Sequence, residues 1–192
     1  MIMRKILSIV IVACFPLLNG CIPLLIGSAI GAGALVVTDR RPASVMGQDE
    51  AISIKAIKMT NDVYRETSHI NVTSYNYNVL ITGEAGSEAI KKDIEVIVRG
   101  IPNVKNVFNE VLVAGNSSLA ARGNDTAITS KVKTRFLGNA GKFSPNHIKV
   151  VTENGVVYLM GIVTKSEAEA ATEVASTTSG VQRVVKLFEY KI

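Results

Sequence analysis

An internal repeat constrains this chain more than any other feature of its sequence. When the 192-residue sequence is shifted against itself by 78 positions, residues 69–83 align with residues 147–161 without a gap, and six of the fifteen aligned pairs are identical. With an offset of 80, Gly100 and Phe108 meet Gly180 and Phe188. A repeat of this length indicates a duplicated structural unit. The sequence therefore predicts two copies of one small module rather than one larger core.

Each copy contains a predicted β-hairpin. Apolar and polar residues alternate at the start of each aligned stretch, turn residues follow, and a second apolar run returns. Asn154-Gly155 is the strongest turn signal in the chain, because both residues tolerate the positive φ angles of a tight hairpin. Gly83 and Gly161 lack the pattern of a phosphate-binding loop, so we expect them where two backbone segments approach closely at a strand end.

Helices and a last strand complete each copy. Apolar residues at helical spacing follow each hairpin, in the second copy behind a Thr164/Glu167 capping box. First helices are predicted over Glu50–Val63 and Asp125–Leu137, and last strands over Val104–Val113 and Val184–Ile192. The predicted fold class is α+β, with two tandem α-β-β-α-β modules, each a three-stranded sheet with two helices on one face.

The chain opens with a segment that is typical of a secretory signal. A charged start precedes an apolar run over residues 6–18, which is too short to span a bilayer. Leu18-Asn19-Gly20-Cys21 resembles a bacterial lipobox, in which Cys21 receives a diacylglycerol and an N-acyl chain. The alternative is an ordinary buried Cys21 within a membrane anchor broken by prolines and glycines. Isoleucine rather than aspartate at position 22 implies, by analogy with bacterial sorting rules, transfer to the outer membrane.

The sequence divides into five predicted segments. They are a lipoprotein signal peptide at 1–20, an acylated tether at 21–47, a first module at 48–114, a linker at 115–123 and a second module at 124–192. The tether is apolar but rich in glycine and alanine, and the linker is rich in glycine, asparagine and serine. Both compositions favour connections without helix, and we expect the linker to be flexible.

Composition excludes several classes of function. Cys14 and Cys21 are the only cysteines, so the folded part can hold neither a disulfide nor a cysteine-based metal site. The formal net charge of +5 includes two positive charges in the leader, and the remaining +3 is too mild to indicate a nucleic-acid partner. His69 and His147 are equivalent in the repeat but lack further ligands, so we expect no metal. No nucleophile signature occurs, and we expect a protein without enzymatic activity or cofactors.

Several stretches within a duplicated pattern behind a lipobox resemble the BON domain family: Ile70–Thr73, Asn124–Thr126 with Ile128-Thr129 and Lys131-Val132, and Val150–Gly161 with Val163-Thr164. The likeness covers nearly the whole mature chain and is greatest to the dual BON-domain outer-membrane lipoproteins, the DolP (YraP) family. The resemblance implies a protein on the periplasmic face of the outer membrane that supports envelope integrity. It also implies binding of anionic phospholipid through the second module and concentration at division sites.

By this resemblance, the first helix of the second module contacts the lipid. The candidate lipid-binding residues are Ala127, Lys131, Lys133, Arg135, Phe136 and Leu137. At about 100° per residue, Ile128, Val132 and Phe136 form a core stripe, and Leu137 points away from it beside Lys133. The remaining surface is basic with an apolar tip, which suits an anionic bilayer. The alternative is a solvated helix whose Leu137 closes the end of its own core.

Two other functions stay open at this level. An exposed sheet edge, or the neighbouring aromatic residues Tyr75 and Tyr77 at the first hairpin tip, would suit an adaptor that binds an envelope protein. A remote third option is an activator of a cell-wall hydrolase. The expected partners are therefore an anionic phospholipid membrane or, for the adaptor, envelope proteins.

Overall fold

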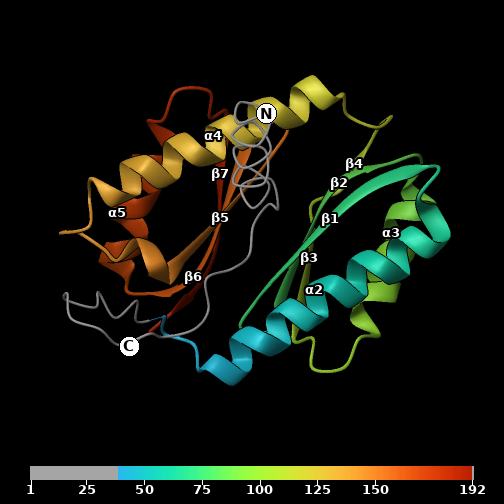
Figure 1. Cartoon of the computed structure of the whole chain (residues 1–192), viewed down its shortest axis with the longest axis horizontal. Helices are drawn as coiled ribbons and strands as arrows, with labels where there is room; N and C mark the ends of the chain where they lie inside the picture. Colours follow the sequence, from blue (N-terminus) through green and yellow to red (C-terminus); the bar gives the residue numbers. More distant parts are fainter. Residues whose placement is uncertain (1–38, 192) are drawn as a thin grey trace, which may run out of the picture. The chain divides into compact units, whose positions relative to one another are not determined.

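The computed structural model describes residues 39–191, which form two α+β modules in succession (Figure 1). The first contains α2 (Ala43–Tyr64), β1 (Ser68–Tyr75), β2 (Asn78–Ala85), α3 (Glu88–Arg99), β3 (Asn106–Asn109) and β4 (Leu112–Val113). The second contains α4 (Leu119–Leu137), the 3₁₀ helix η2 (Pro145–His147), β5 (Ile148–Glu153), β6 (Val156–Val163), α5 (Lys165–Ser176) and β7 (Arg183–Tyr190). The predicted fold class is confirmed. The predicted signal peptide, Cys21 and most of the predicted tether lie outside the described residues.

The two modules share one sheet topology. The hairpins β1-β2 and β5-β6 are antiparallel, and the last strand returns parallel to the second strand, which is central. β3 and β4 pair with β2 in one register, because Asn106 lies opposite Asn78 and Leu112 lies opposite Glu84. They are therefore one strand that is interrupted at residues 110–111, where the sequence predicted a continuous strand.

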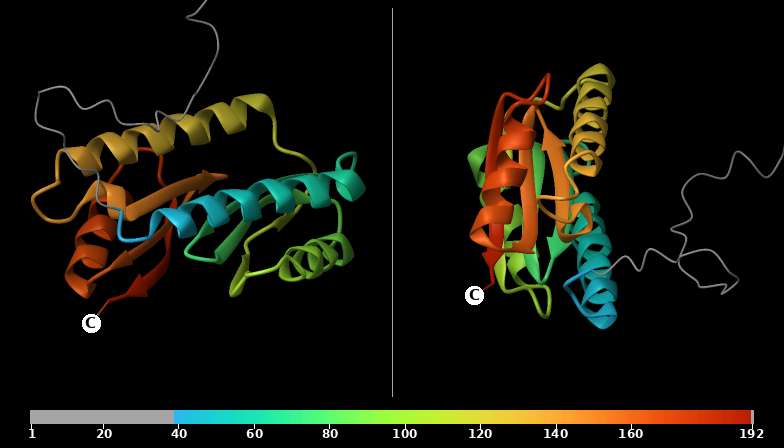
Figure 2. Two further views of the ribbon diagram at one scale, coloured as in Figure 1. Left: turned by 60° about the horizontal axis from the view of Figure 1, so that its bottom comes forward. Right: turned by 90° about the vertical axis from the view of Figure 1, so that its left-hand side faces the viewer.

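One face of each sheet packs against the two helices of its module. α2 packs on β1 and lies beside α3, and α4 packs on β5 and lies beside α5 (Figure 2). Alternate residues of each strand point into these cores. On the central strands these are Val79 and Ile81 in the first module and Val157 and Leu159 in the second.

A buried aspartate on the first helix of each module holds the hairpin turn. The Asp49 carboxylate accepts hydrogen bonds from the backbone N–H groups of Asn76-Tyr77 at 2.7 and 2.8 Å. The Asp125 carboxylate accepts those of Asn154-Gly155, both at 2.9 Å. All four turn residues have positive φ, as a tight hairpin turn requires. The turn amides therefore converge on one carboxylate, which ties each hairpin to its helix.

Both first helices begin earlier than the sequence predicted. α2 starts at Ala43 and includes residues 43–47 of the predicted tether. α4 starts at Leu119, so the prediction of a flexible linker is wrong for residues 119–123. The hydroxyl of Ser118 accepts a hydrogen bond from the N–H of Ala121 at 3.2 Å and caps α4. The prediction placed this start at the later Asn124-Asp125 pair, but Asp125 is buried and binds the turn instead.

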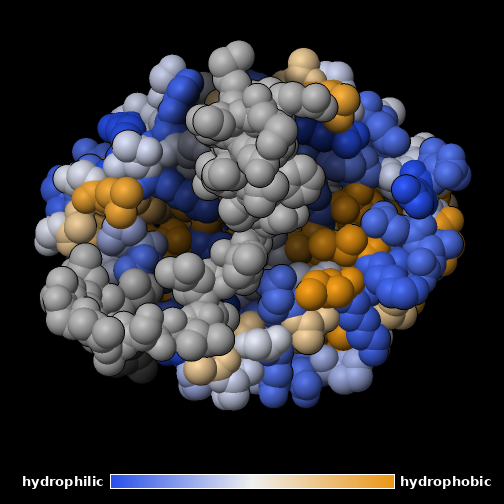
Figure 3. All heavy atoms as spheres, viewed as in Figure 1, coloured by the Kyte–Doolittle hydropathy of each residue, from blue (hydrophilic) through white to orange (hydrophobic). Residues whose placement is uncertain are grey.

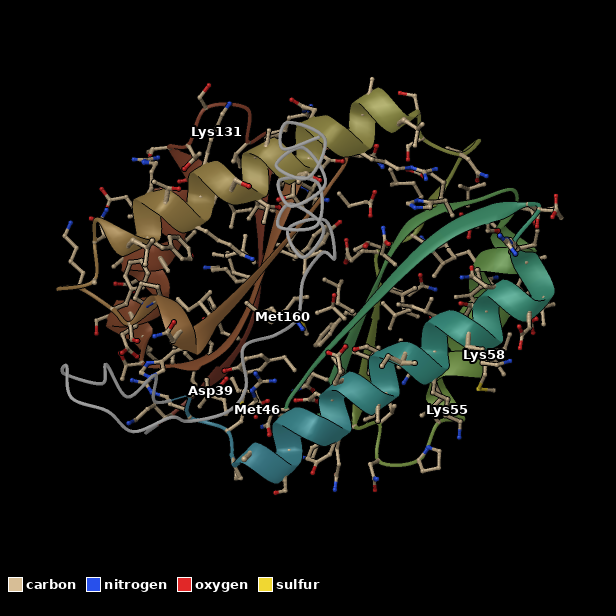
Figure 4. The ribbon with its side chains drawn as sticks, in the orientation of Figure 1. Asp39, Met46, Lys55, Lys58, Lys131 and Met160 are labelled. Carbon is tan, nitrogen blue, oxygen red and sulfur yellow. The ribbon has the colours of Figure 1, made fainter. Side chains whose placement is uncertain are left out.

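The second faces of the two sheets pack on each other. Tyr75, Leu80, Tyr158 and Met160 form a buried group, which we call the intermodule cluster. Met160 is fully buried and lies between the two sheets (Figure 4). Hydrogen bonds around the cluster join the pairs Asn71–Glu153, Asn78–Glu189 and Asn154–Glu84. Because both faces leave water together, residues 39–191 belong to one compact unit.

Arg40, which precedes α2, also binds the second module. Its guanidinium donates to the Glu167 carboxylate and to the carbonyl oxygen of Ile162, each at 2.7 Å. Glu167 completes the predicted capping box with Thr164, which is confirmed. The hydrogen bond from Arg40 outweighs the opposing effect of burial and, with the bond from Thr164, lowers the pKa of Glu167 to about 2.

We expect acid to weaken the contact between Arg40 and Glu167. Because the pKa of Glu167 lies below its ordinary value of 4.5, its carboxylate stabilises the fold above that value and loses this contribution as the pH falls towards 2. Arg40→Met should lower the free energy of unfolding near neutral pH, and the deficit should shrink between about pH 5 and pH 2. Denaturant titrations at several pH values measure this difference, and a constant deficit across the range would contradict the expectation.

Gly83 and Gly161 lie at close backbone approaches, as predicted. A Cβ on Gly83 would lie 1.9 Å from the carbonyl oxygen of His69, and a Cβ on Gly161 would lie 2.4 Å from that of His147. Gly83 also has a φ of +109°, which residues with side chains rarely adopt. Both glycines therefore let the second strand of a hairpin lie close to the start of the first.

Gly83→Ala should lower the free energy of unfolding by at least about 2 kcal/mol, because it adds a clash to an unfavourable φ. Gly123→Ala is the matched control, since that glycine lies in α4 with open space around it. The control should keep the stability or raise it by up to about 1 kcal/mol. Chemical denaturation measures both, and equal effects would show that the close approach at Gly83 does not constrain the hairpin.

Candidate functional site

α4 buries one stripe of residues and exposes the rest. Ile128, Val132 and Phe136 pack into the core of the second module, as their helical spacing predicted. Phe136 is only 1% exposed, and its ring stands edge-on to Phe143 with centroids 4.9 Å apart. The inclusion of Phe136 among the lipid-binding candidates is therefore wrong for the folded module.

The exposed side of α4 combines two large apolar residues with lysines. Leu119 is 84% exposed at the start of the helix and Leu137 is 68% exposed at its end. They are 18 residues apart, which is five helical turns, so they lie along one line of the helix. We call this side the outer face, and it comprises Leu119, Thr126, Ala127, Ser130, Lys131, Lys133 and Leu137.

The figures show the same arrangement. An apolar patch lies at the C-terminal end of α4 among hydrophilic residues (Figure 3). Lys131 lies on the side of α4 that faces away from the strands (Figure 4). Among residues 39–191, no hydrogen bond or ion pair holds the ammonium groups of Lys131 and Lys133. Their charges are therefore available to a ligand.

Arg135 differs from the two lysines, because its guanidinium binds its own module. It donates to the carbonyl oxygen of Val174 and the hydroxyl of Thr178, both at 2.8 Å. A third bond reaches the hydroxyl of Thr177 at 3.0 Å. The side chain thus joins the end of α4 to the end of α5, a contact that helical spacing alone could not reveal.

Arg135→Met should lower the free energy of unfolding by about 1.5–3 kcal/mol, because hydrogen bonds to a charged group are lost and the carbonyl of Val174 loses a donor. Lys131→Met removes the same charge from the same helix but breaks no bond within residues 39–191, so its effect should stay within about 0.5 kcal/mol. Thermal or denaturant unfolding compares the two. If both variants were equally stable, Arg135 would contribute no more to the free energy of unfolding than an ordinary surface charge does.

The two histidines take part in structural contacts. Nδ1 of His69 lies 3.4 Å from the carboxylate of Glu84, and the carbonyl oxygen of His147 accepts a hydrogen bond from the Tyr75 hydroxyl at 3.2 Å. Within the part of the chain that the structure describes, no three potential metal ligands come together. The same part contains no helix with the length and apolar character needed to cross a bilayer.

The prediction that Tyr75 and Tyr77 form an exposed hairpin tip is wrong for Tyr75. Its side chain is 3% exposed within the intermodule cluster, and the Arg41 guanidinium lies 3.8 Å from its ring centroid. Tyr77 is partly buried, and its hydroxyl donates to Gln48 at 2.7 Å. The second module thus covers Tyr75, whereas Tyr77 contacts Gln48 and Lys105 of its own module.

Comparison with known proteins assigns the chain to a family. Residues 54–115 and 124–192 match the BON domain family, one match in each module. The chain is 34% identical to outer membrane lipoprotein DolP of Haemophilus influenzae over 176 residues, which cover 90% of each chain. This chain belongs to the dual BON-domain DolP family. The relationship that the sequence predicted is thereby confirmed.

Other proteins are also similar to this DolP-family chain. It is 30% identical to the 21 kDa hemolysin of Actinobacillus pleuropneumoniae over 79% of both chains. It is 29% identical to osmotically-inducible protein Y of Escherichia coli over 80% of this chain and 78% of the relative. Among solved structures, the type III secretion protein CdsD of Chlamydia trachomatis matches 70% of this chain and 91% of its own, at 11% identity and a TM-score of 0.27, which is too low to support an argument.

Proposed function

We propose that this DolP-family protein is a non-enzymatic lipoprotein of the outer membrane that binds anionic phospholipid through the outer face of α4. Acyl chains on Cys21 anchor it to the periplasmic face, where it supports envelope integrity and concentrates at division sites. The name of the Haemophilus relative, an outer membrane lipoprotein, supports this location. The lipobox-like Leu18-Asn19-Gly20-Cys21 supports the anchor.

The observation that carries the proposal is the exposed Leu137 beside Lys133, with Lys131 on the other flank of the same helix. Neither lysine has a hydrogen bond or ion pair among residues 39–191. A leucine that leaves water contributes about 1.5–3 kcal/mol. Each lysine near an anionic surface contributes about 1 kcal/mol. Membranes that contain phosphatidylglycerol offer both the negative charge and the hydrocarbon that this surface requires. A helix that only faced water would require neither.

An acyl anchor would make this weak contact effective. The 18 peptide units between Cys21 and Asp39 can extend to at most about 65 Å. A tether of that length holds α4 near the bilayer at a high effective concentration, so a contact of a few kcal/mol becomes largely occupied. The helix can then leave and rebind while the protein stays attached.

The test is a charge reversal at the end of α4. Lys133→Glu with Leu137→Glu should weaken binding to phosphatidylglycerol-containing vesicles by at least about 30-fold, since reversing one near-surface charge alone costs about 2 kcal/mol. Flotation of vesicles with the non-acylated mature chain measures binding without the anchor. Both side chains are exposed, so the fold should persist.

α3 provides a matched control. Lys92 and Val96 are also exposed, also four residues apart and also on a helix, but they belong to the first module. Lys92→Glu with Val96→Glu changes the net charge by the same amount and should leave flotation within about twofold of the wild type, because a site away from the bilayer gains nothing from near-surface attraction. Unchanged flotation of the α4 variant, or equal loss in both variants, would refute the proposal.

A further inference from the structure

A cleft of about 460 Å³ lies beside the C-terminal half of α4, and its volume is that of a small-molecule site. Its walls come from α4, from the edge strand β5 and from the first module. Its apolar lining comes from the exposed Leu137 and from the buried Phe136, Ile148 and Val150. Its cationic lining comes from Lys133, Lys149 and Arg41. The cleft therefore offers positive charge and apolar surface within reach of one ligand.

Lys149 is the unusual residue in this cleft. It lies on β5 between Ile148 and Val150, which point into the core, so its side chain points to the opposite face of the strand. Lys149 is partly buried, yet among residues 39–191 its ammonium group has no hydrogen bond and no ion pair. Long cationic side chains seldom lie buried without a partner.

Asp49 and Asp39 already have partners, whereas Glu50 attracts the Lys149 ammonium group through its charge without a hydrogen bond or ion pair to it. Asp49 accepts four hydrogen bonds, from Arg41, from the hydroxyl of Ser74 and from the two turn amides. Asp39 pairs with Arg41 at 2.8 Å, so the guanidinium of Arg41 is compensated from both sides. Among residues 39–191, neither Lys133 nor Lys149 has an ion pair that offsets its charge in this cleft.

The electrostatics of Lys149 agree with this geometry. Burial and the neighbouring cations Arg41 and Lys133 lower the pKa of Lys149, against the opposing effect of Glu50 and Asp49. A bound anion would remove this destabilisation of the charged ammonium group, because an opposite charge at short range favours the protonated form. The lining of the cleft is therefore suited to a negative group.

We propose that this cleft binds the phosphodiester head group of an anionic phospholipid, with Lys133 and Lys149 on the phosphate oxygens and the first part of an acyl chain along Leu137. This proposal rests on the proposed function and deepens it, since it replaces a general attraction to the surface with one lipid held in a defined site. A free phosphate ion would use the two lysines but leave the apolar wall uncovered. A phospholipid matches both parts of the lining, because its phosphodiester suits the two lysines and its acyl chain suits Leu137.

The test uses the full mature chain without acyl groups and a soluble short-chain phosphatidylglycerol, dihexanoyl phosphatidylglycerol, below its micelle concentration. In this format no membrane surface is present, so exposed lysines outside the cleft contribute little. Lys149→Met should weaken binding at least about tenfold, because charge-assisted hydrogen bonds to the phosphate are lost. Side-chain NMR signals of the lysines report the titration.

Lys92→Met is the matched control, because it removes the same charge from an exposed residue of α3 that does not line the cleft. It should bind the short-chain lipid within about twofold of the wild type, since no phosphate contact is lost. Lys149→Arg keeps the charge and should retain most of the affinity, which separates loss of the cation from disturbance of β5. Thermal unfolding should show that Lys149→Met is at least as stable as the wild type.

The outcomes distinguish this inference from the proposed function. Equal affinities of Lys149→Met and Lys92→Met for the short-chain lipid would overturn the proposal for the cleft, even if the α4 double variant loses vesicle binding and the proposed function stands. Inorganic phosphate binding as tightly as the lipid would overturn the assignment to a phospholipid. Binding of the short-chain lipid that depends on Lys149, without any vesicle flotation by the wild type, would support the cleft and refute the broader proposal.

Discussion

The structure depends on the fact that each sheet has two apolar faces but helices for only one of them. In a single module, Leu80 of β2 or Tyr158 and Met160 of β6 would lie in water on the face opposite the helices. Burial of these residues against each other is the favourable term that joins the modules. It also directs all four helices outward, so that the outer face of α4 is exposed while the sheets are not. The intermodule cluster therefore determines which surfaces are left for binding.

The larger arrangement could be predicted because it follows from short-range patterns. Alternation over the hairpins, helical spacing around Ile128, Val132 and Phe136, and the Thr164/Glu167 capping box each depend on residues that are close in sequence. The repeat shows the same order of elements twice, once in each module. The ends of α2 and α4 were harder to place, because polar residues such as Asp125 resemble helix caps until a distant turn is seen to bind them.

The contacts of the candidate site could not be predicted to the same extent. That Lys131 and Lys133 are exposed followed from helical geometry, but the bonds of Arg135 to the end of α5 depend on how two helices pack. The burial of Tyr75 and the crowding around Lys149 depend on the approach of the other module. Nothing in the local pattern around these residues signals a partner more than 70 residues away. Sequence periodicity reveals which face a residue is on, and only the fold reveals what meets that face.

The two ends of the folded region meet at one place. Arg40 donates to the carbonyl oxygen of Ile162, and the N–H of Lys191 donates to that of Val163 at 3.0 Å. Residues near both ends of the described region 39–191 are thus attached to adjacent residues of β6. A circular permutant that joins these ends and opens the chain near residue 116 would exchange the order of the modules without moving any of their contacts. The contacts of the folded protein therefore do not require the two modules to follow each other in this order along the chain.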